Sequence, residues 1–485
     1  MSTAAALCRQ AINHHDSTIH HLPPEVLAAV ASHLDDKKSL IAATHVCHRW
    51  RSTFLSLPRL WSRVVFSDIQ RALAFLERSK SVTVSVCLPG GNEPFPVVKE
   101  SLKSIAGRLV GLKGAYNKFL GEFLTQPLPL LRDLDLFGPR SPPGRSLVPS
   151  LPSVRSLTTY AIDYPPLRVK NLTNFHFKLP PCLCISPTFG GGLLEFLRSC
   201  PLLEVVHFCY GHKHRDIGST ISGASTEMVS LPCLRSFTHD SFIDKVDMAL
   251  FDRLSVPPTC DLAFAVVIRS RSPGNRPWAH AFPTPRNPSY ISDVKTVKVI
   301  ANFQDTHNPR PTFRTEFFNS KNARISFNRT SDPHSTSTFI KLLNFLESSG
   351  ITHSVETLRL ENLHEGLPMN LPDRLTNFDN LKTLILWQCR PAPFLFTPPP
   401  AMWCRTVQKL VVCLLPPTHP RGAWDEVADL RRVRNLAAQR KKHGVPLGAV
   451  TTFSRDIKYL SQGSRREMEE LKSCVGSMEV VGLGD

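Results

Sequence analysis

The first apolar residues of the chain recur at the spacing of an amphipathic helix. Pro23 and Pro24 suit a first helical turn, where a missing amide hydrogen costs nothing. Aliphatic residues at positions 26, 27, 30 and 34 then predict a helix that ends near Asp35-Asp36. A second helix is expected from Ser39, and a third apolar cluster follows it. The second helix carries Leu40, Ile41, Val46 and Trp50, and the cluster holds Leu55, Leu57, Leu60 and Trp61.

A different pattern starts beyond residue 66: one apolar residue, two of any kind, one apolar, one of any kind, one apolar. The last two apolar positions are two residues apart, so both side chains fall on the same face of a strand. Clear copies are Leu131-Leu134-Leu136, Leu172-Phe175-Phe177, Leu203-Val206-Phe208, Val294-Val297-Val299, Val355-Leu358-Leu360, Leu381-Leu384-Leu386 and Val407-Leu410-Val412. Weaker copies are Val154-Leu157, Leu234-Phe237, Leu262-Ala265-Val267 and Leu447-Val450.

Amphipathic segments precede several of these strands, at 69–76, 116–124, 193–197 and 339–346. The repeating unit is therefore a helix followed by a strand, and it recurs irregularly, roughly every 20 to 30 residues. Near the end, 424–443 and 465–474 are predicted helical, and 448–453 and 478–481 extended. A final helix and strand would cap the array, as repeat proteins require for solubility. The 41 prolines concentrate in stretches such as 138–152, 269–288, 391–400 and 416–420, which we expect to be loops between units.

The order of residues in the first segment carries a family resemblance. Leu22-Pro23, spaced aliphatics, Val46-Cys47-x-x-Trp50 and Leu60-Trp61 resemble the F-box, the helical module that docks a protein onto the Skp-type adaptor of an SCF ubiquitin ligase. Ala31 replaces a bulkier apolar residue, and Lys37-Lys38-Ser39 replaces the usual acidic approach to the second helix. By resemblance, the surface facing the adaptor is formed or supported by Leu22, Pro23, Leu27, Leu34, Val46, Cys47 and Trp50.

Three helices of this size enclose little core, so large apolar side chains should remain exposed until a partner covers them. We expect this exposure at Leu22, Leu27, Val46 and Trp50. The alternative is a small bundle that belongs to a larger core, since most apolar helical stripes are core.

The repeats after this segment resemble irregular leucine-rich repeats, and the pairing resembles F-box receptors of the fungal type. The sequence thus predicts an α/β chain with a flexible tail over 1–18 and a three-helix F-box over 19–66. A curved leucine-rich-repeat-like α/β solenoid follows over 67–485, with a helix-strand cap at about 421–485. Asparagine or cysteine is mostly absent from the usual turn position of such repeats. One doubly wound α/β sheet is the alternative, because it also alternates helix and strand.

If the units stack, the residues that flank each apolar pair point away from the core, on the concave side. These positions hold Asp133, Asp135, Phe137, His176, Lys178, His207, Cys209, Thr296, Lys298, Arg359, Glu361, Ile385 and Trp387. All except His207, Cys209, Thr296 and Ile385 are candidate target contacts. Phe137 and Trp387 are the expected anchors, because aromatic residues dominate interface hot spots. Ordinary packing under a loop is the alternative for both.

Composition and motifs exclude several other classes of protein. The chain of 485 residues is 42% hydrophobic and 20% charged, as in a globular protein. Its 13 cysteines are scattered and fit reduced thiols. No stretch has the length of a membrane helix and no secretory signal opens the chain, so we expect a cytoplasmic or nuclear protein.

No phosphate-binding loop, metalloprotease or nucleophile motif is present, so no enzyme, cofactor or metal is predicted. Gly190-Gly191-Gly192 fits a helix start better than a phosphate cradle. The best metal candidates, His207, Cys209, His212 and His214, have no zinc-site spacing.

We therefore expect a non-enzymatic substrate receptor. It would bind the Skp-type adaptor and through it a cullin-RING ligase, and would present an unknown protein target on the repeat surface. The alternative is a scaffold associated with nucleic acid. It rests on a formal net charge of +18 and on the basic segment Arg431–Lys442, which would contact phosphates. The positive charge is spread along the chain, so the sequence does not favour nucleic acid as the partner.

Overall fold

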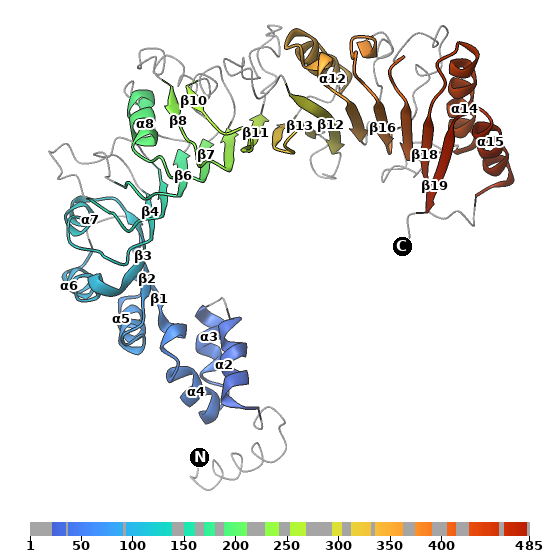
Figure 1. Cartoon of the computed structure of the whole chain (residues 1–485). Helices are drawn as coiled ribbons and strands as arrows, with labels where there is room; N and C mark the ends of the chain where they lie inside the picture. The colour runs from blue at the N-terminus through green and yellow to red at the C-terminus, as the bar shows by residue number, and fades with distance from the viewer. Residues whose placement is uncertain are drawn as a thin grey trace. The chain divides into compact units, whose positions relative to one another are not determined.

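The computed structural model describes residues 22–34, 37–90, 94–137, 150–160, 169–179, 189–210, 228–241, 253–267, 293–302, 312–330, 335–361, 374–389, 405–413, 426–454 and 460–482 (Figure 1). The chain divides into two compact units, residues 1–175 and 176–485. The expected tail at 1–18 and most of the four proline-rich stretches lie outside the described residues. No described helix has both the length and the apolar character needed to cross a bilayer.

Unit 1 begins with three short helices, α2 (Pro24–Ser32), α3 (Lys37–Ala43) and α4 (His48–Leu55), and the 3-10 turn η2 (Pro58–Trp61). The prediction of one continuous second helix from Ser39 through Trp50 was wrong, because the chain breaks between α3 and α4. Cys47 is extended (φ −158°) and the Thr44 hydroxyl bonds back to the Ile41 carbonyl at 2.7 Å. Arg51 Nε also donates to the Thr44 carbonyl at 2.9 Å, which caps the end of α3.

The remainder of unit 1 alternates strands with helices. In order they are β1 (Arg63–Val65), α5 (Ile69–Arg78), β2 (Val84–Cys87), α6 (Pro96–Ile105), η3 (Ala106–Arg108), β3 (Leu109–Ala115), α7 (Lys118–Phe123), β4 (Asp133–Phe137) and β5 (Ser156–Thr159). Each strand pairs in parallel with the next, from β1 through β5. Figure 1 shows α5, α6 and α7 along one side of these strands. The six-residue pattern missed β1, β2, β3 and α6.

Strand β6 (Asn174–Leu179) spans the boundary between the units, and unit 2 continues with α8 (Phe189–Arg198), β7 (Val205–Tyr210), β9 (Ser236–Ser241) and β11 (Asp261–Val267). Gly190–Gly192 lie in the first turn of α8, as expected for a helix start. β7, β9 and β11 pair in parallel in that order. The two-residue strands β8 (Val229–Ser230) and β10 (Leu254–Ser255) form a separate parallel pair.

An antiparallel excursion interrupts the repeats of unit 2. β12 (Val294–Asn302) pairs antiparallel with β13 (Thr312–Asn319), which pairs antiparallel with β14 (Arg324–Thr330). β14 is also parallel to β11, and β12 is parallel to β15 (Thr357–Glu361). The sequence did not predict β13 or β14, because both alternate without the six-residue pattern. Their turn contains Asn322 at φ 60°, a left-handed conformation that asparagine tolerates.

The last part of unit 2 returns to regular repeats: α12 (Ser335–Ser348), η5 (Ile351–His353), β15, β16 (Thr383–Trp387), β17 (Lys409–Cys413), α14 (Glu426–Lys442), β18 (Ala449–Ser454), α15 (Gln462–Lys472) and β19 (Ser477–Gly482). β15 to β19 pair in parallel in chain order. The helices and strands predicted between 424 and 481 are confirmed within a few residues.

The repeated apolar positions form the core of both units. Leu131, Leu134 and Leu136 are at most 2% exposed, and so are Leu381, Leu384 and Leu386 in unit 2. The α/β class, with amino-terminal helices followed by repeats of leucine-rich-repeat type, is confirmed. A doubly wound sheet would reverse its strand order at a switch point. Instead, each repeat strand here pairs with the strand of the following repeat, apart from the β12–β14 excursion.

Candidate functional site: two interaction surfaces

The three amino-terminal helices enclose a small apolar core. Leu27 and Ala31 of α2, Leu40 of α3 and Phe54 of α4 are all at most 4% exposed. Other large apolar residues face solvent, namely Val26 (41% exposed), Val30 (39%) and Val46 (58%). Val26 and Val30 are four residues apart, so they lie on the same face of α2. This segment therefore presents apolar surface that its own core does not cover.

The predicted adaptor-facing residues differ in exposure. Pro23 and Val46 are exposed, and Leu22, Leu34, Cys47 and Trp50 are half-buried. The expectation that Leu27 is exposed was wrong: it is 0% exposed and lies on the core-facing side of α2. Trp50 stacks at a tilt on Phe54, with ring centroids 5.3 Å apart. Within the described residues, Trp50 Nε1 is buried and has no hydrogen-bond partner.

The sequence interpretation placed Val26 and Val30 in the same stripe as Leu27 and Leu34. The structure separates them, because Val26 and Val30 face outward while Leu27 faces the core. The sequence contains a signal of this outward-facing apolar surface. Apolar residues on α2 cover more than the one face that a helix packed on a single core needs.

Trp61 joins the three helices to the first repeat. Its ring is 0% exposed, its Nε1 donates to the Phe54 carbonyl at 3.0 Å, and it meets Phe75 of α5 edge-on at 4.9 Å. The Arg78 guanidinium lies 4.7 Å from the Trp61 ring, and Lys37 Nζ lies 5.8 Å from the Phe75 ring. Burial lowers the pKa of Lys37. The lysine that replaces the usual acidic approach to the second helix thus packs on α5.

On the solvent-facing side of the strands of unit 1, Asp135 of β4 pairs with Lys113 of β3, with Nζ and Oδ2 2.8 Å apart. The hydrogen bond to Asp135 raises the pKa of Lys113. Phe137 is half-buried against Tyr160, at 6.3 Å between centroids, and Lys113 Nζ lies 6.0 Å from its ring. Asp133 is exposed. Phe137 is therefore packed along one side, and its role as an anchor stays a prediction.

In unit 2, His176 of β6 meets His207 of β7 edge-on, with ring centroids 5.6 Å apart. Burial, with the charges of His207 and Lys178, lowers the pKa of His176. Both rings and Lys178 are half-buried. The three residues lie on the predicted face, away from the Phe177 and Phe208 side chains in the core.

Four further candidates, Lys298, Arg359, Glu361 and Trp387, come together around strands β12 to β16. Lys298 of β12 lies opposite Arg359 of β15 in the strand register. Its Nζ is 3.3 Å from Glu361 Oε2, and Arg359 pairs with the same carboxylate. Arg359 also lies over the Trp387 ring at 5.3 Å. Trp387 is half-buried beside Phe453 of β18, with centroids 5.1 Å apart.

The unpredicted strands β13 and β14 extend this group. Glu316 of β13 lies 4.0 Å from Lys298 Nζ, 2.6 Å from Arg314 Nη2 and 3.5 Å from Arg324 Nη1. Four cations thus surround two carboxylates. We call Lys298, Arg314, Arg324 and Arg359 the cationic cluster. Its side chains are 24% to 40% exposed, whereas those of Glu316 and Glu361 are 7% and 9% exposed. The accessible surface of the group is therefore positive.

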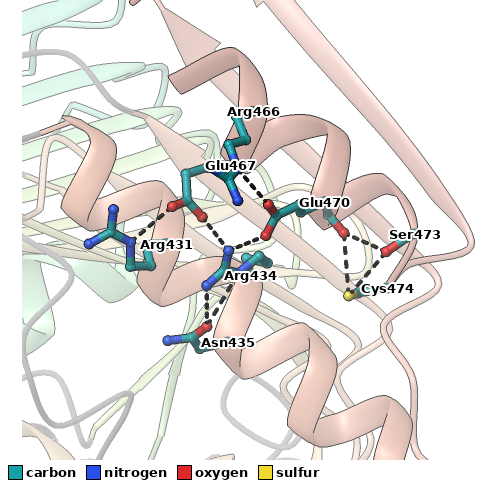
Figure 2. Close-up of polar contacts among 8 residues, drawn as sticks. All are labelled: Arg431, Arg434, Asn435, Arg466, Glu467, Glu470, Ser473 and Cys474. Atoms are coloured by element: carbon teal, nitrogen blue, oxygen red, sulfur yellow. Dashed lines mark hydrogen bonds and ion pairs between the residues drawn. The ribbon is translucent and has the colours of Figure 1, made fainter. Parts of the chain in front are cut away.

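The basic carboxy-terminal segment is arranged differently from the cationic cluster. Figure 2 shows Arg431 and Arg434 of α14 directed at Glu467 and Glu470 of α15. Arg431 Nε is 2.9 Å and Arg434 Nη1 2.8 Å from the Glu467 carboxylate, and Arg434 also pairs with Glu470.

Two other cations of this segment, Arg432 and Arg440, are also engaged. Arg432 pairs with Asp429 at 2.7 Å. Arg440 is 2% exposed and donates to the Val407 carbonyl at 2.8 Å. Arg431 and Arg434 therefore link α14 to α15, and Arg440 links α14 to the segment before β17.

The described residues hold no group of three or more His, Cys, Asp or Glu that could bind a metal ion. His212 and His214 lie outside them. Among the described cysteines, Cys87, Cys233, Cys260 and Cys474 are free thiols. Burial raises the pKa of Cys260 to about 12, so it is an inert core thiol.

Comparison with known proteins identifies the amino-terminal segment. Residues 19–67 match the family model described as F-box-like. The search of curated proteins gave no match. Among solved structures, the chain is similar to the leucine-rich repeat-containing protein LegL7 from Legionella pneumophila, at 12% identity and a TM-score of 0.29. That match covers 68% of this chain and 84% of LegL7. The predicted F-box character of the segment is confirmed by the family match.

Proposed function

We propose that the chain is a substrate-recognition subunit of an SCF-type ubiquitin ligase. Its F-box-like helices dock onto a Skp-type adaptor, and its repeats present a protein target. The observation that carries the docking half is the exposed apolar surface at Val26, Val30 and Val46 on a segment that matches the F-box-like family. Burying such surface against a partner contributes ~25 cal/mol per Å² of apolar area.

Catalysis by this chain is not part of the proposal. A receptor acts by proximity: it raises the local concentration of the target near the conjugating enzyme carried by the ligase. The resemblance to the fungal type of receptor and the cytoplasmic or nuclear location stay predictions. Nucleic-acid binding through α14 is the weaker alternative, because Arg431, Arg432 and Arg434 already pair with carboxylates of their own unit.

The test is capture of purified Skp-type adaptor by the full chain carrying Val26→Asp. Val26 follows Pro24 in the first turn of α2, and an acidic side chain is well placed there for the helix dipole. We expect adaptor affinity to fall about ten-fold or more, since a charge would have to be desolvated at the contact. Thermal unfolding should stay close to wild type, because the Val26 side chain does not contribute to the core.

Val97→Asp is the matched control. Val97 follows Pro96 in the first turn of α6 and is 43% exposed, against 41% for Val26. It should bind adaptor as wild type does. Adaptor binding that is equal in all three proteins, or absent from wild type, would remove the docking half of the proposal.

A further inference from the structure

The outer face of β14, β13, β12 and β15 combines a surplus of positive charge with a fixed arrangement. Four cations face two carboxylates, so the group carries a formal charge of 4 − 2 = +2. Structural pairing alone would need one cation for each carboxylate. Glu316 and Glu361 are nearly buried beneath the cations, which leaves the guanidinium groups as the accessible part.

The buried carboxylates also restrict the positions of the cations. Glu316 contacts Arg314, Arg324 and Lys298, and Glu361 contacts Lys298 and Arg359. A guanidinium has five N–H donors, and one ion pair uses only part of them. Side chains held in this way lose less rotamer entropy when they bind an anion, so the face is preorganised for one.

An aromatic floor adjoins the charges. Trp387 lies under Arg359 at 5.3 Å and beside Phe453 at 5.1 Å, and both rings are half-buried. A partner that fits this face needs negative charge over the cationic cluster and an apolar side chain over Trp387. Helix α12 does not cover this face, because it packs on the opposite side, where Phe345 meets the core residue Phe317 at 6.5 Å.

We propose that this face binds an acidic protein segment that carries an aromatic or aliphatic anchor. The inference rests on the proposed function, for which it defines the chemistry of the target. Adjacent strands are ~4.8 Å apart, so β14 to β15 span ~14 Å, the length of about four residues of extended peptide. Carboxylates of such a peptide can bind the guanidinium groups in bidentate geometry, at intervals that avoid Glu316 and Glu361.

Nucleic acid fits the same face less well. A nucleic-acid strand places negative charge at short, regular intervals along its whole length. A protein segment can place its acidic residues selectively. The surplus of two charges, spread over four strands, is also small for a polyanion.

The experiment measures how much of a fluorescently labelled peptide, with acidic residues around one phenylalanine, the immobilised chain retains. Its counterpart with glutamine for glutamate and a single-stranded oligothymidylate of matched charge are run in parallel. The full chain is immobilised through a carboxy-terminal tag in one arm and on the adaptor in the other. Wild type should bind the acidic peptide saturably, and binding should weaken as added salt shortens the Debye length.

The diagnostic variant is Arg314→Gln/Arg324→Gln, which removes two cations that share Glu316. Its matched control is Lys295→Gln/Lys382→Gln, which removes two cations of the same unit that share Glu356, at 3.2 and 2.9 Å. We expect the peptide affinity of the diagnostic variant to fall about ten-fold, which corresponds to ~1.4 kcal/mol. The peptide affinity of the control variant should fall by a factor of less than about two. Arg324→Gln alone and Trp387→Leu keep the test decisive if the double variant does not fold.

Two results would overturn the inference: no preference for the acidic over the neutral peptide, or equal losses in the diagnostic and control variants. Tighter binding of the oligothymidylate would also overturn it. The two capture arms separate this inference from the proposed function. Peptide binding in the tagged arm without adaptor capture would contradict the receptor assignment and leave the acidic-segment site standing. Adaptor capture without peptide binding would contradict the acidic-segment site and leave the receptor assignment standing.

Discussion

The junction at Trp61 gives the sharpest prediction about stability. This residue belongs to the 3-10 turn after α4, yet its ring contacts Phe75 of α5, 4.9 Å between centroids. Its indole N–H also donates to the Phe54 carbonyl at 3.0 Å. Replacing Trp61 with alanine removes both connections at once. We therefore expect Trp61→Ala to weaken the F-box-like helices and the first repeat together.

The magnitude follows from burial. A fully buried tryptophan replaced by alanine costs ~3–5 kcal/mol, which includes the cavity left behind. Within that total, the edge-on contact with Phe75 contributes ~0.5–1.5 kcal/mol and the hydrogen bond to Phe54 a similar amount. A loss of ~3 kcal/mol in the free energy of unfolding raises the population of the locally unfolded state by a factor of about one hundred or more. Trp61→Phe keeps a ring against Phe75 and loses the hydrogen bond, so it should cost about 1–2 kcal/mol.

Native-state hydrogen exchange is the appropriate assay, because a chain of two units need not unfold in one step. In Trp61→Ala, protection of the amides in α4 and α5 should fall by similar factors, and the strands β15 to β19 should keep theirs. Trp50→Ala is the control: Trp50 is half-buried and stacks on Phe54 of its own helix, α4. Wild-type protection of α5 in Trp61→Ala would refute a shared junction, and so would a phenylalanine variant that loses as much protection as the alanine variant.

Two further predictions concern the carboxy-terminal repeats. A Cβ at Gly476 would lie 2.6 Å from the Gly448 carbonyl oxygen. Gly476→Ala should therefore destabilise the β18–β19 pair by ~1–3 kcal/mol, measured by urea unfolding. Gly107→Ala is the control and should be neutral, because a Cβ there would have nothing within 4 Å. Burial raises the pKa of Glu426 in the folded state above the value of 4.5 that it has in the unfolded chain. The ionised carboxylate therefore destabilises the fold at pH values above the folded-state pKa, and this destabilisation disappears below the unfolded-state pKa. Glu426→Gln should therefore raise the melting temperature at pH 7 by an increment that shrinks as pH falls towards 4.5; an increment independent of pH would contradict this assignment.

The repeat strands were predictable because each one is set by a local apolar pattern. Leu381, Leu384 and Leu386 mark β16 from six residues of sequence, and their burial follows from the pleat. The break between α3 and α4 was not predictable from periodicity. Val46 and Trp50 continue the helical spacing, but the turn depends on the extended backbone at Cys47 and on the Arg51 side chain that caps α3. Apolar spacing carries no information about such a cap.

The candidate target face was predicted in part for the same reason. Lys298, Arg359 and Trp387 flank recognisable apolar pairs, so their shared face followed from strand alternation. Arg314 and Glu316 were missed because β13 runs antiparallel and has no such pattern. Half of the cationic cluster therefore comes from two strands that only the three-dimensional pairing reveals.

Positive charge has different consequences in α14 and in the cationic cluster. In α14 the arginines lie along a helix that packs on α15, where Glu467 and Glu470 face them from the neighbouring helix. The charges there are neutralised across a packing interface. On β12 to β15 the carboxylates come from the same strand face as the cations and lie beneath them, so the cations stay accessible. The run of basic residues on α14 thus links two helices, whereas the dispersed basic residues of the cationic cluster form the proposed binding face. The net charge of +18 does not by itself distinguish the two cases.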